Sequence, residues 1–172
     1  MAVAEDFSFE ERQEQERMVL ESVDRFLDKD VAPYAHDLEA DDTYPQEIVD
    51  KMVDMGLFGA TIGAEYGGLG LSVSTYAKIV ERVSTVWMSV SGIFNSHLIM
   101  AAAVERAGTD EQKAKWLPKF ASGELRGGIA LTEPDAGTDL QGIRTRADKS
   151  GNGYSLNGCL LYTSPSPRDR SI

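Results

Sequence analysis

The sequence predicts an all-α N-terminal domain of about five to six helices, followed by an incomplete β-barrel or sheet segment, within a multi-domain α+β parent. Two observations support this prediction. Apolar residues recur at spacings of three and four up to about residue 125, the period of amphipathic helices. From Gly127 the pattern changes to alternation, which is typical of strands. We therefore expect a helical domain over residues 1–125 and the start of a β domain over residues 126–158.

Composition and charge exclude several classes of protein. The chain has 172 residues, of which 42% are hydrophobic and 26% charged, as in folded globular proteins. Its net charge of −11 argues against nucleic acid as a partner, because phosphate binding requires a basic face.

Cysteine usage and the N-terminal residues bear on localisation. Cys159 is the only cysteine, so an intrachain disulfide is impossible and a reducing compartment is expected. Residues 1–10 carry three acidic side chains and no basic one, which argues against a typical targeting segment. No apolar run approaches the ~20 residues of a membrane span. We expect a cytoplasmic protein.

The first two helices are predicted from apolar spacing and from proline and glycine. Residues 9–32 form the first, and Pro33 ends it. The second begins with Pro45 at its first position and ends at Gly56, the usual asymmetry of helix termini. The apolar stripe of the first helix consists of Val19, Val23, Phe26, Leu27 and Val31.

Three further helices complete the predicted helical domain. Ser72 or Ser74 caps a third helix, whose apolar stripe ends at Trp87. Residues 90–106 are apolar almost all round, which is typical of a helix buried between others. The fifth helix starts at the capping-box pattern Thr109-x-x-Gln112 and carries Trp116, Leu117 and Phe120.

Two features that resemble functional sites are better explained as structural. The segment Gly63–Gly70 has four glycines in eight residues but lacks the Lys-Ser/Thr pair of a phosphate-binding loop, so we interpret it as a turn. His97 has no cysteine or carboxylate at ligand spacing, and the second histidine is the distant His36. We therefore expect a satisfied or pocket-lining histidine and predict no metal site.

The β part begins with a short apolar strand, Ile129 to Leu131, that runs into a turn. Pro134 fixes one φ angle and Gly137 permits a positive one, while hydroxyl and carboxylate side chains can bind backbone groups nearby. Such an exposed turn suits a ligand with carbonyl and phosphate groups, although by itself this pattern more often marks a plain turn between two strands. Further alternation over residues 143–156, broken by Gly151-Asn152-Gly153, predicts a β-hairpin.

Several ordered motifs resemble landmarks of the acyl-CoA dehydrogenase family, over about residues 8 to 158. The most specific is the run 130–139, Ala-Leu-Thr-Glu-Pro-Asp-Ala-Gly-Thr-Asp, which is similar to the family's flavin-loop signature. Thr138 departs from it, standing where serine is commoner and keeping the hydroxyl. The remaining similar segments are Tyr44–Ile48, Gly56–Gly59, Glu65–Gly70 and Gln112–Pro118.

The resemblance implies an FAD-dependent enzyme that oxidises the Cα–Cβ bond of an acyl-CoA thioester. It implies that Ile129, Ala130, Leu131 and Thr132 lie along the flavin ring, with the N–H and hydroxyl of Thr132 on its pyrimidine edge. Gly137 and Thr138 would approach the FAD phosphates, and Thr138 would also lie near the thioester arm of the substrate.

Glu133 and Asp139 also match signature positions, and the resemblance implies that they stabilise the loop rather than act as bases. The family's catalytic glutamate lies in its C-terminal helical domain, and no position here matches it. We therefore predict no catalytic residue in this chain, which is expected to be inactive and a poor flavin binder.

The resemblance further implies that electrons pass to an electron-transfer flavoprotein and that the full-length parent is a homo-oligomer. Two alternatives remain open. One is a non-catalytic helical binding module that uses the loop for another ligand. The other is a fragment of a related acyl-CoA oxidase or flavin monooxygenase.

The C-terminal residues depart from the family pattern. Residues 154–158 match it, whereas Leu160 replaces a lysine and Thr163-Ser164 replaces an Ile-Thr pair. Two Ser-Pro repeats follow, a composition that neither continues a sheet nor starts a helix. We expect residues 159–172 to be foreign to the family sequence, or else a genuine disordered tail.

Overall fold

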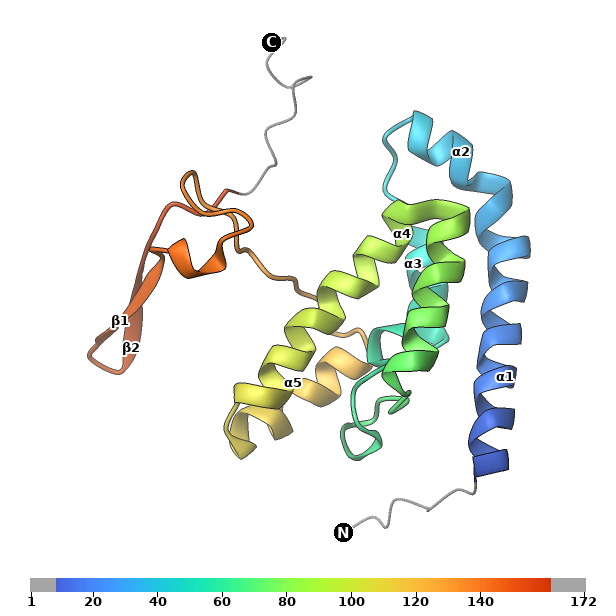
Figure 1. The fold of residues 1–172 in the computed structure, drawn as a ribbon, viewed down its shortest axis with the longest axis horizontal. Helices are drawn as coiled ribbons and strands as arrows, with labels where there is room; N and C mark the ends of the chain where they lie inside the picture. Colours follow the sequence, from blue (N-terminus) through green and yellow to red (C-terminus); the bar gives the residue numbers. More distant parts are fainter. Residues whose placement is uncertain (1–8, 162–172) are drawn as a thin grey trace. The chain divides into compact units, whose positions relative to one another are not determined.

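The structure is a computed structural model and describes residues 9–161 of the chain. It contains two compact units, which divide between Gly128 and Ile129 (Figure 1). The first is helical, and the second carries a two-stranded antiparallel sheet. Within residues 9–161 there are five α-helices, the lower end of the predicted five to six. Beyond Leu161, the predicted off-pattern tail lies outside the described residues.

The first helix continues past the residue at which the sequence predicted its end. Helix α1 (Phe9–Phe26) passes through a π-helical turn, η1 (Leu27–Val31), into α2 (Ala32–Ala40). Pro33 was expected to stop the helix, and this expectation is wrong. Pro33 instead lies in the first turn of α2, where a missing N–H costs little because the first N–H groups of a helix lack internal partners.

The second predicted helix is confirmed, beginning one residue after Pro45 and ending two residues before Gly56. Helix α3 (Gln46–Asp54) follows Pro45, and Gly56 adopts a left-handed φ of +74° just after it. Two short 3₁₀ turns follow, η2 (Leu57–Gly59) and η3 (Ala64–Tyr66).

The glycine-rich segment after η2 is a structural turn, as predicted. The N–H of Leu69 donates to the carbonyl of Gly59 at 2.9 Å, and that of Leu71 donates to Ala60 at 2.8 Å. A Cβ atom at Gly68 would lie 2.1 Å from the carbonyl oxygen of Ile62. The backbone therefore approaches itself so closely at this position that only glycine fits.

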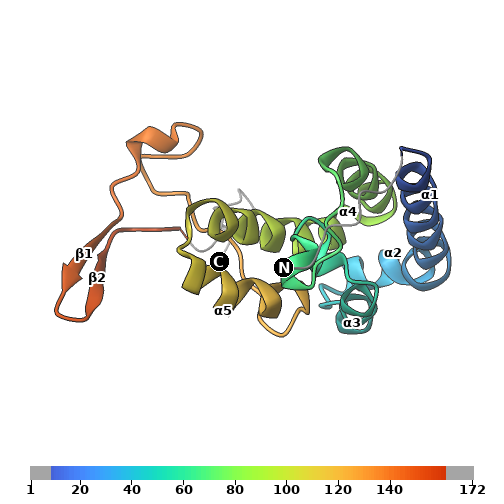
Figure 2. The ribbon, with the colours of Figure 1, turned by 90° about the horizontal axis from the view of Figure 1, so that it is seen from below.

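The third and fourth predicted helices are two arms of one element, α4 (Val73–Ala107), which breaks at Trp87 with φ −156° and ψ 103°. Ser72 caps its start by accepting a hydrogen bond from the N–H of Thr75 at 3.1 Å. At the break, the carboxylate of Glu39 accepts hydrogen bonds from the Trp87 indole N–H and the Ser89 hydroxyl. Figures 1 and 2 show α1 beside the first arm of α4.

By length and composition, α4 could cross a membrane, which corrects the expectation that no apolar run approaches that length. Ten of its residues are buried among the other helices, and the break at Trp87 divides it. Nine of these ten are apolar or histidine and serine side chains at helical spacing, and the apolar ones belong to the hydrophobic core of the helical unit.

Helix α5 (Asp110–Ala121) starts at the predicted capping box. The N–H of Gln112 donates to the Thr109 hydroxyl at 3.3 Å, and the N–H of Thr109 donates to the Gln112 side chain at 2.8 Å. The helices share one continuous hydrophobic core. Its largest fully buried apolar side chains are Phe58, Phe94, Met52, Leu57, Ile62, Ile79 and Leu117.

The second unit contains two of the three strands that the sequence predicted. Strands β1 (Arg146–Ser150) and β2 (Gly153–Asn157) form the predicted hairpin, and Gly151 has φ +57° in the two-residue loop that joins them. Residues 129–131 form no strand, which corrects the prediction. A strand needs a neighbour to share its ladder, and the only backbone bond from this region to a distant described residue joins Leu161 N–H to Thr132 O at 2.8 Å.

Two glycine substitutions test the packing of the helical unit. We expect Gly68→Ala to lower the free energy of unfolding by about 1–3 kcal/mol, because its Cβ would overlap the backbone of Ile62. Gly92→Ala is the matched control, since a Cβ there meets nothing within 4 Å inside α4; it should stabilise by about 0.5–1 kcal/mol. Urea denaturation of both variants measures the difference, and equal midpoints would contradict the proposed close approach.

Candidate functional site

The predicted flavin-loop residues lie together on an exposed stretch of the second unit. Ile129 and Leu131 are each 41% exposed, a large fraction for apolar side chains. Thr132, Gly137 and Thr138 are also exposed. Their backbone N–H groups, and the hydroxyls of both threonines, make no hydrogen bond within residues 9–161. The segment thus offers apolar surface beside unpaired donors.

The loop is held in shape by the buried carboxylate of Glu133, which is 6% exposed. This carboxylate accepts hydrogen bonds from the N–H of Arg144 at 2.9 Å and the N–H of Thr145 at 2.7 Å, and also from the Thr145 hydroxyl. Backbone bonds between Glu133 and Ala136, at 2.9 and 3.2 Å, close a tight turn over Pro134. One side chain therefore joins the turn to the segment that leads into β1.

These partners decide the chemistry of Glu133. The Thr145 hydroxyl, and next the N–H of Arg144, hold the pKa of the Glu133 carboxyl below its ordinary value of 4.5. A carboxylate with a lowered pKa and occupied oxygens is a poor proton acceptor. The structural role expected for Glu133 agrees with this geometry.

The second acidic residue of the signature is also engaged locally. The carboxylate of Asp139 accepts a hydrogen bond from the N–H of Gln141 at 3.1 Å and so caps the short turn η4 (Leu140–Gly142). The exposed Asp135 lies 3.4 Å from the guanidinium of Arg144. The loop carboxylates thus contribute to the conformation of the turn.

His97 is fully buried, with both ring nitrogens hydrogen-bonded. Nε2 lies 3.1 Å from the carbonyl oxygen of Phe120, and Nδ1 accepts from the N–H of Gly127 at 3.4 Å. Burial is the main cause that lowers the pKa of His97 from 6.5. The described residues hold no cluster of three or more histidine, cysteine or carboxylate groups suited to a metal ion. His97 is a satisfied core histidine.

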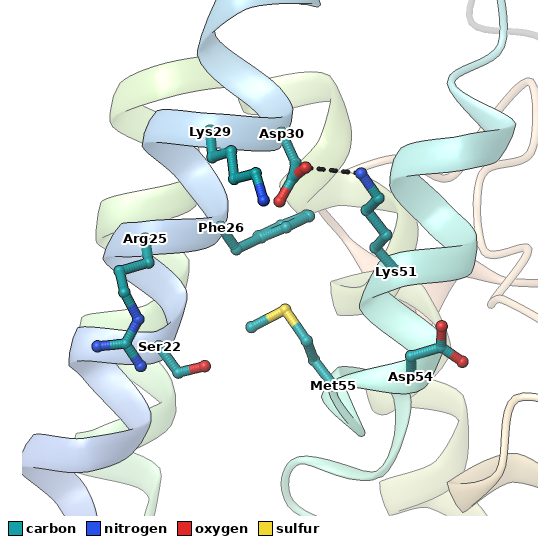
Figure 3. A pocket seen from close by; sticks show the side chains of 8 residues that line it. All are labelled: Ser22, Arg25, Phe26, Lys29, Asp30, Lys51, Asp54 and Met55. Carbon is teal, nitrogen blue, oxygen red and sulfur yellow. Dashed lines mark hydrogen bonds and ion pairs between the residues drawn. The ribbon is translucent and has the colours of Figure 1, made fainter.

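A hollow of about 370 Å³ between α1 and α3 was not foreseen from the sequence (Figure 3). Lys51 and Asp30 form an ion pair across it at 2.6 Å, and this bond raises the pKa of Lys51. The spacing of residues in the sequence does not predict this hollow, because its lining residues come from helices about 25 positions apart. They are Ser22, Arg25, Phe26, Lys29, Asp30, Lys51, Asp54 and Met55.

Replacing Glu133 tests its role in the loop. We expect Glu133→Gln to speed amide hydrogen exchange at Arg144 and Thr145, because an amide oxygen is a weaker acceptor than a carboxylate. Asp135→Asn is the matched control, because that side chain is exposed and makes a single long contact. NMR exchange rates on both variants measure the effect; similar rates in the two would contradict it.

The lowered pKa of Glu133 also predicts the direction of a pH effect. A group whose folded pKa is depressed stabilises the folded state fully above its unfolded pKa, here about 4.5. This stabilisation should be lost as the pH falls below 4.5 through the lower folded value. Acid titration of the Thr145 amide resonance should show this loss in the parent chain, and Glu133→Gln should not show it.

Comparison with known proteins identifies relatives of known function. The chain is 40% identical over 146 residues to (2S)-methylsuccinyl-CoA dehydrogenase of Cereibacter sphaeroides, covering 84% of this chain and 27% of that protein. It is 35% identical over 158 residues to the short-chain specific acyl-CoA dehydrogenase of Clostridium acetobutylicum. This match covers 91% of this chain and 41% of that protein. The chain therefore spans between about a quarter and two-fifths of the length of these relatives.

Solved structures share the fold. Butyryl-CoA dehydrogenase of Megasphaera elsdenii matches with a TM-score of 0.77 at 30% identity, over 89% of this chain and 40% of that one. Glutaryl-CoA dehydrogenase of Mycobacterium smegmatis, in complex with FADH2, matches with a TM-score of 0.76 at 28% identity. This match covers 84% of this chain and 37% of that one.

The family assignment follows from the helical unit. Residues 13–124 match the family model of the acyl-CoA dehydrogenase N-terminal domain. This range covers helices α1 to α5 almost completely. The chain belongs to the acyl-CoA dehydrogenase family.

Proposed function

We propose that this chain supplies the N-terminal helical domain and the flavin loop of an FAD-dependent acyl-CoA dehydrogenase. The observation that carries the proposal is the exposed loop pinned by Glu133, with unpaired donors beside apolar side chains, in a chain of this family. The substrate class is an acyl-CoA thioester, and the electron acceptor is an electron-transfer flavoprotein. We also propose that the full-length parent is a homo-oligomer and that it is cytoplasmic.

The loop residues fit the chemistry of a flavin. An isoalloxazine ring has two apolar faces and a polar pyrimidine edge, and the exposed Ile129 and Leu131 can pack against such a face. The N–H and hydroxyl of Thr132 can bind its polar edge. A Cβ at Gly137 would meet nothing within 4 Å, so the backbone there is open to a phosphate group, and Thr138 adds a hydroxyl beside it.

Each residue of the loop binds or orients, and none transfers a proton. FAD, when bound, supplies the hydride acceptor for Cα–Cβ oxidation. Thr132 and Thr138 donate hydrogen bonds that place the ring and the thioester arm of the substrate. Glu133 keeps both threonines in place by fixing the turn between them. We infer that the chain by itself lacks a catalytic base, because no position matches the family's catalytic glutamate and the carboxylates of Glu133 and Asp139 accept loop N–H groups.

A titration with FAD tests this proposal. We expect weak binding by the 172-residue chain, and we expect Thr132→Val to weaken it by about fivefold to tenfold, the value of one hydrogen bond. Thr85→Val is the matched control, because Thr85 lies exposed in the helical unit and bonds only within α4. Equilibrium dialysis with flavin fluorescence measures both, and equal affinities would contradict the assignment of the loop.

An activity assay tests the absence of a base. The chain, saturated with FAD and given butyryl-CoA and an artificial electron acceptor, should show no turnover above that of free FAD. Turnover that disappears in Thr132→Val would overturn the inference that this chain lacks a base.

A further inference from the structure

We propose that His97 is a positioning residue for the flavin loop: its ring anchors the backbone at Gly127, two residues before the loop begins. The inference rests on the proposed function in one respect, namely that residues 129–138 bind flavin. The anchor itself is a property of the helical unit, which includes both His97 and Gly127.

The ring of His97 is held in one orientation. It lies edge-to-face with Phe58 at 5.1 Å between ring centroids and with Phe120 at 5.8 Å. Nε2 is 3.1 Å from the Phe120 carbonyl oxygen, which can only accept, so Nε2 must carry the proton. Nδ1 is then an acceptor, and it faces the N–H of Gly127 at 3.4 Å. The bonds to Phe120 and Gly127 fit the neutral tautomer that carries its proton on Nε2, and the backbone of Phe58 makes a further hydrogen bond with the ring.

Other residues of α4 lie close to Gly127 and to the next residue, Gly128. A Cβ at Gly127 would lie 2.6 Å from the sulfur of Met100, and a Cβ at Gly128 would lie 3.8 Å from the Cβ of Ser96. Neither glycine has a side chain with which to hold its own position. His97 therefore provides the polar contact that fixes this part of the chain.

The preceding residue is held by separate contacts. The guanidinium of Arg126 lies 5.8 Å from the centroid of the Phe58 ring, and one of its nitrogens donates to the Tyr44 hydroxyl at 3.4 Å. Arg126 can therefore retain its place when His97 is changed. This separation allows the contribution of Gly127 to be measured alone.

The protonation state of His97 suits this role. Burial, the largest cause, lowers its pKa from 6.5; backbone hydrogen bonds with Phe120 and Phe58 oppose this shift, and the charge of Arg126 adds to it. The imidazole thus stays neutral near pH 7, and Nδ1 keeps the lone pair that Gly127 needs. A protonated ring would present an N–H to Gly127 and could not accept.

Two amide substitutions separate the bonds made by the two ring nitrogens. The amide of asparagine reaches the position of Nδ1, so His97→Asn can keep the acceptor for Gly127 and lose the bond to Phe120. The longer glutamine reaches the position of Nε2, so His97→Gln can keep the bond to Phe120 and lose the acceptor. Both variants remove the ring and leave a buried polar group, so each serves as the stability control for the other.

The first readout is amide hydrogen exchange of the full chain, measured by NMR at Gly127. We expect exchange at Gly127 to be about threefold to tenfold faster in His97→Gln than in His97→Asn, the value of one hydrogen bond. The exchange rate of the Leu117 amide in α5 and the melting temperature of each variant report its global stability. The rates at Gly127 are compared after correction for any difference in that stability. Equal exchange at Gly127 in two folded variants would overturn the anchor.

A second measurement needs no variant and remains decisive if either substitution prevents folding. Long-range ¹⁵N NMR of the parent chain at pH 7 should show His97 with Nε2 protonated and Nδ1 unprotonated. The opposite tautomer, or a charged ring, would overturn the proposal, because Gly127 would then have no acceptor.

FAD titration connects the anchor to the loop. We expect the FAD dissociation constant to be at least threefold higher for His97→Gln than for His97→Asn. Faster exchange at Gly127 with an unchanged dissociation constant would overturn the positioning role. If the parent chain and Thr132→Val bind FAD equally, the proposed function fails, and the exchange at Gly127 still decides the anchor.

Discussion

The bend of α4 at Trp87 is the constraint on which the helical unit depends. A straight helix of 35 residues would extend about 50 Å, far beyond the core of a small domain. No charged residue lies between Arg82 and Glu105, so a straight α4 would leave a long uncharged surface in water. The bend divides α4 into two arms that share one core with α1 and α5.

Polar contacts between the arms hold this bend. The hydroxyl of Tyr76 in the first arm donates to the side-chain carbonyl of Asn95 in the second, and burial raises the pKa of Tyr76 to about 12, so the donor stays protonated. Ser84 donates to the hydroxyl of Ser91 at 2.9 Å across the same bend. Glu39 of α2 also accepts a hydrogen bond from the Trp87 indole, so α4 is tied to α2 at its break.

Different interactions stabilise the conformations of the two units. The helical unit has a continuous apolar core, and within the described residues no buried side-chain nitrogen or oxygen lacks a hydrogen-bond partner. In the second unit, every residue of β1 and β2 is exposed, and Tyr154 and Leu156 are 71% and 77% exposed. Local bonds through Glu133, rather than a core, therefore organise the loop there. A two-stranded hairpin without a packed face is at best marginally stable in water.

Local signals in the sequence determined the start of α5 at Thr109, the end of α3 near Gly56 and the hairpin turn at Gly151, because a cap or a turn depends on residues within a few positions. The loop motif predicted the family, which the comparisons show, and Thr132 and Thr138 as flavin-loop residues, which stays a prediction. Only the tertiary structure decided that α2 follows Pro33, that α4 bends at Trp87 and that residues 129–131 form no strand. It also selected Arg144 and Thr145 as the partners of Glu133 and Gly127 as the partner of His97. The contacts of Trp87, His97 and Glu133 join groups 11 to 48 positions apart, and no local pattern encodes which distant donor will meet a buried acceptor.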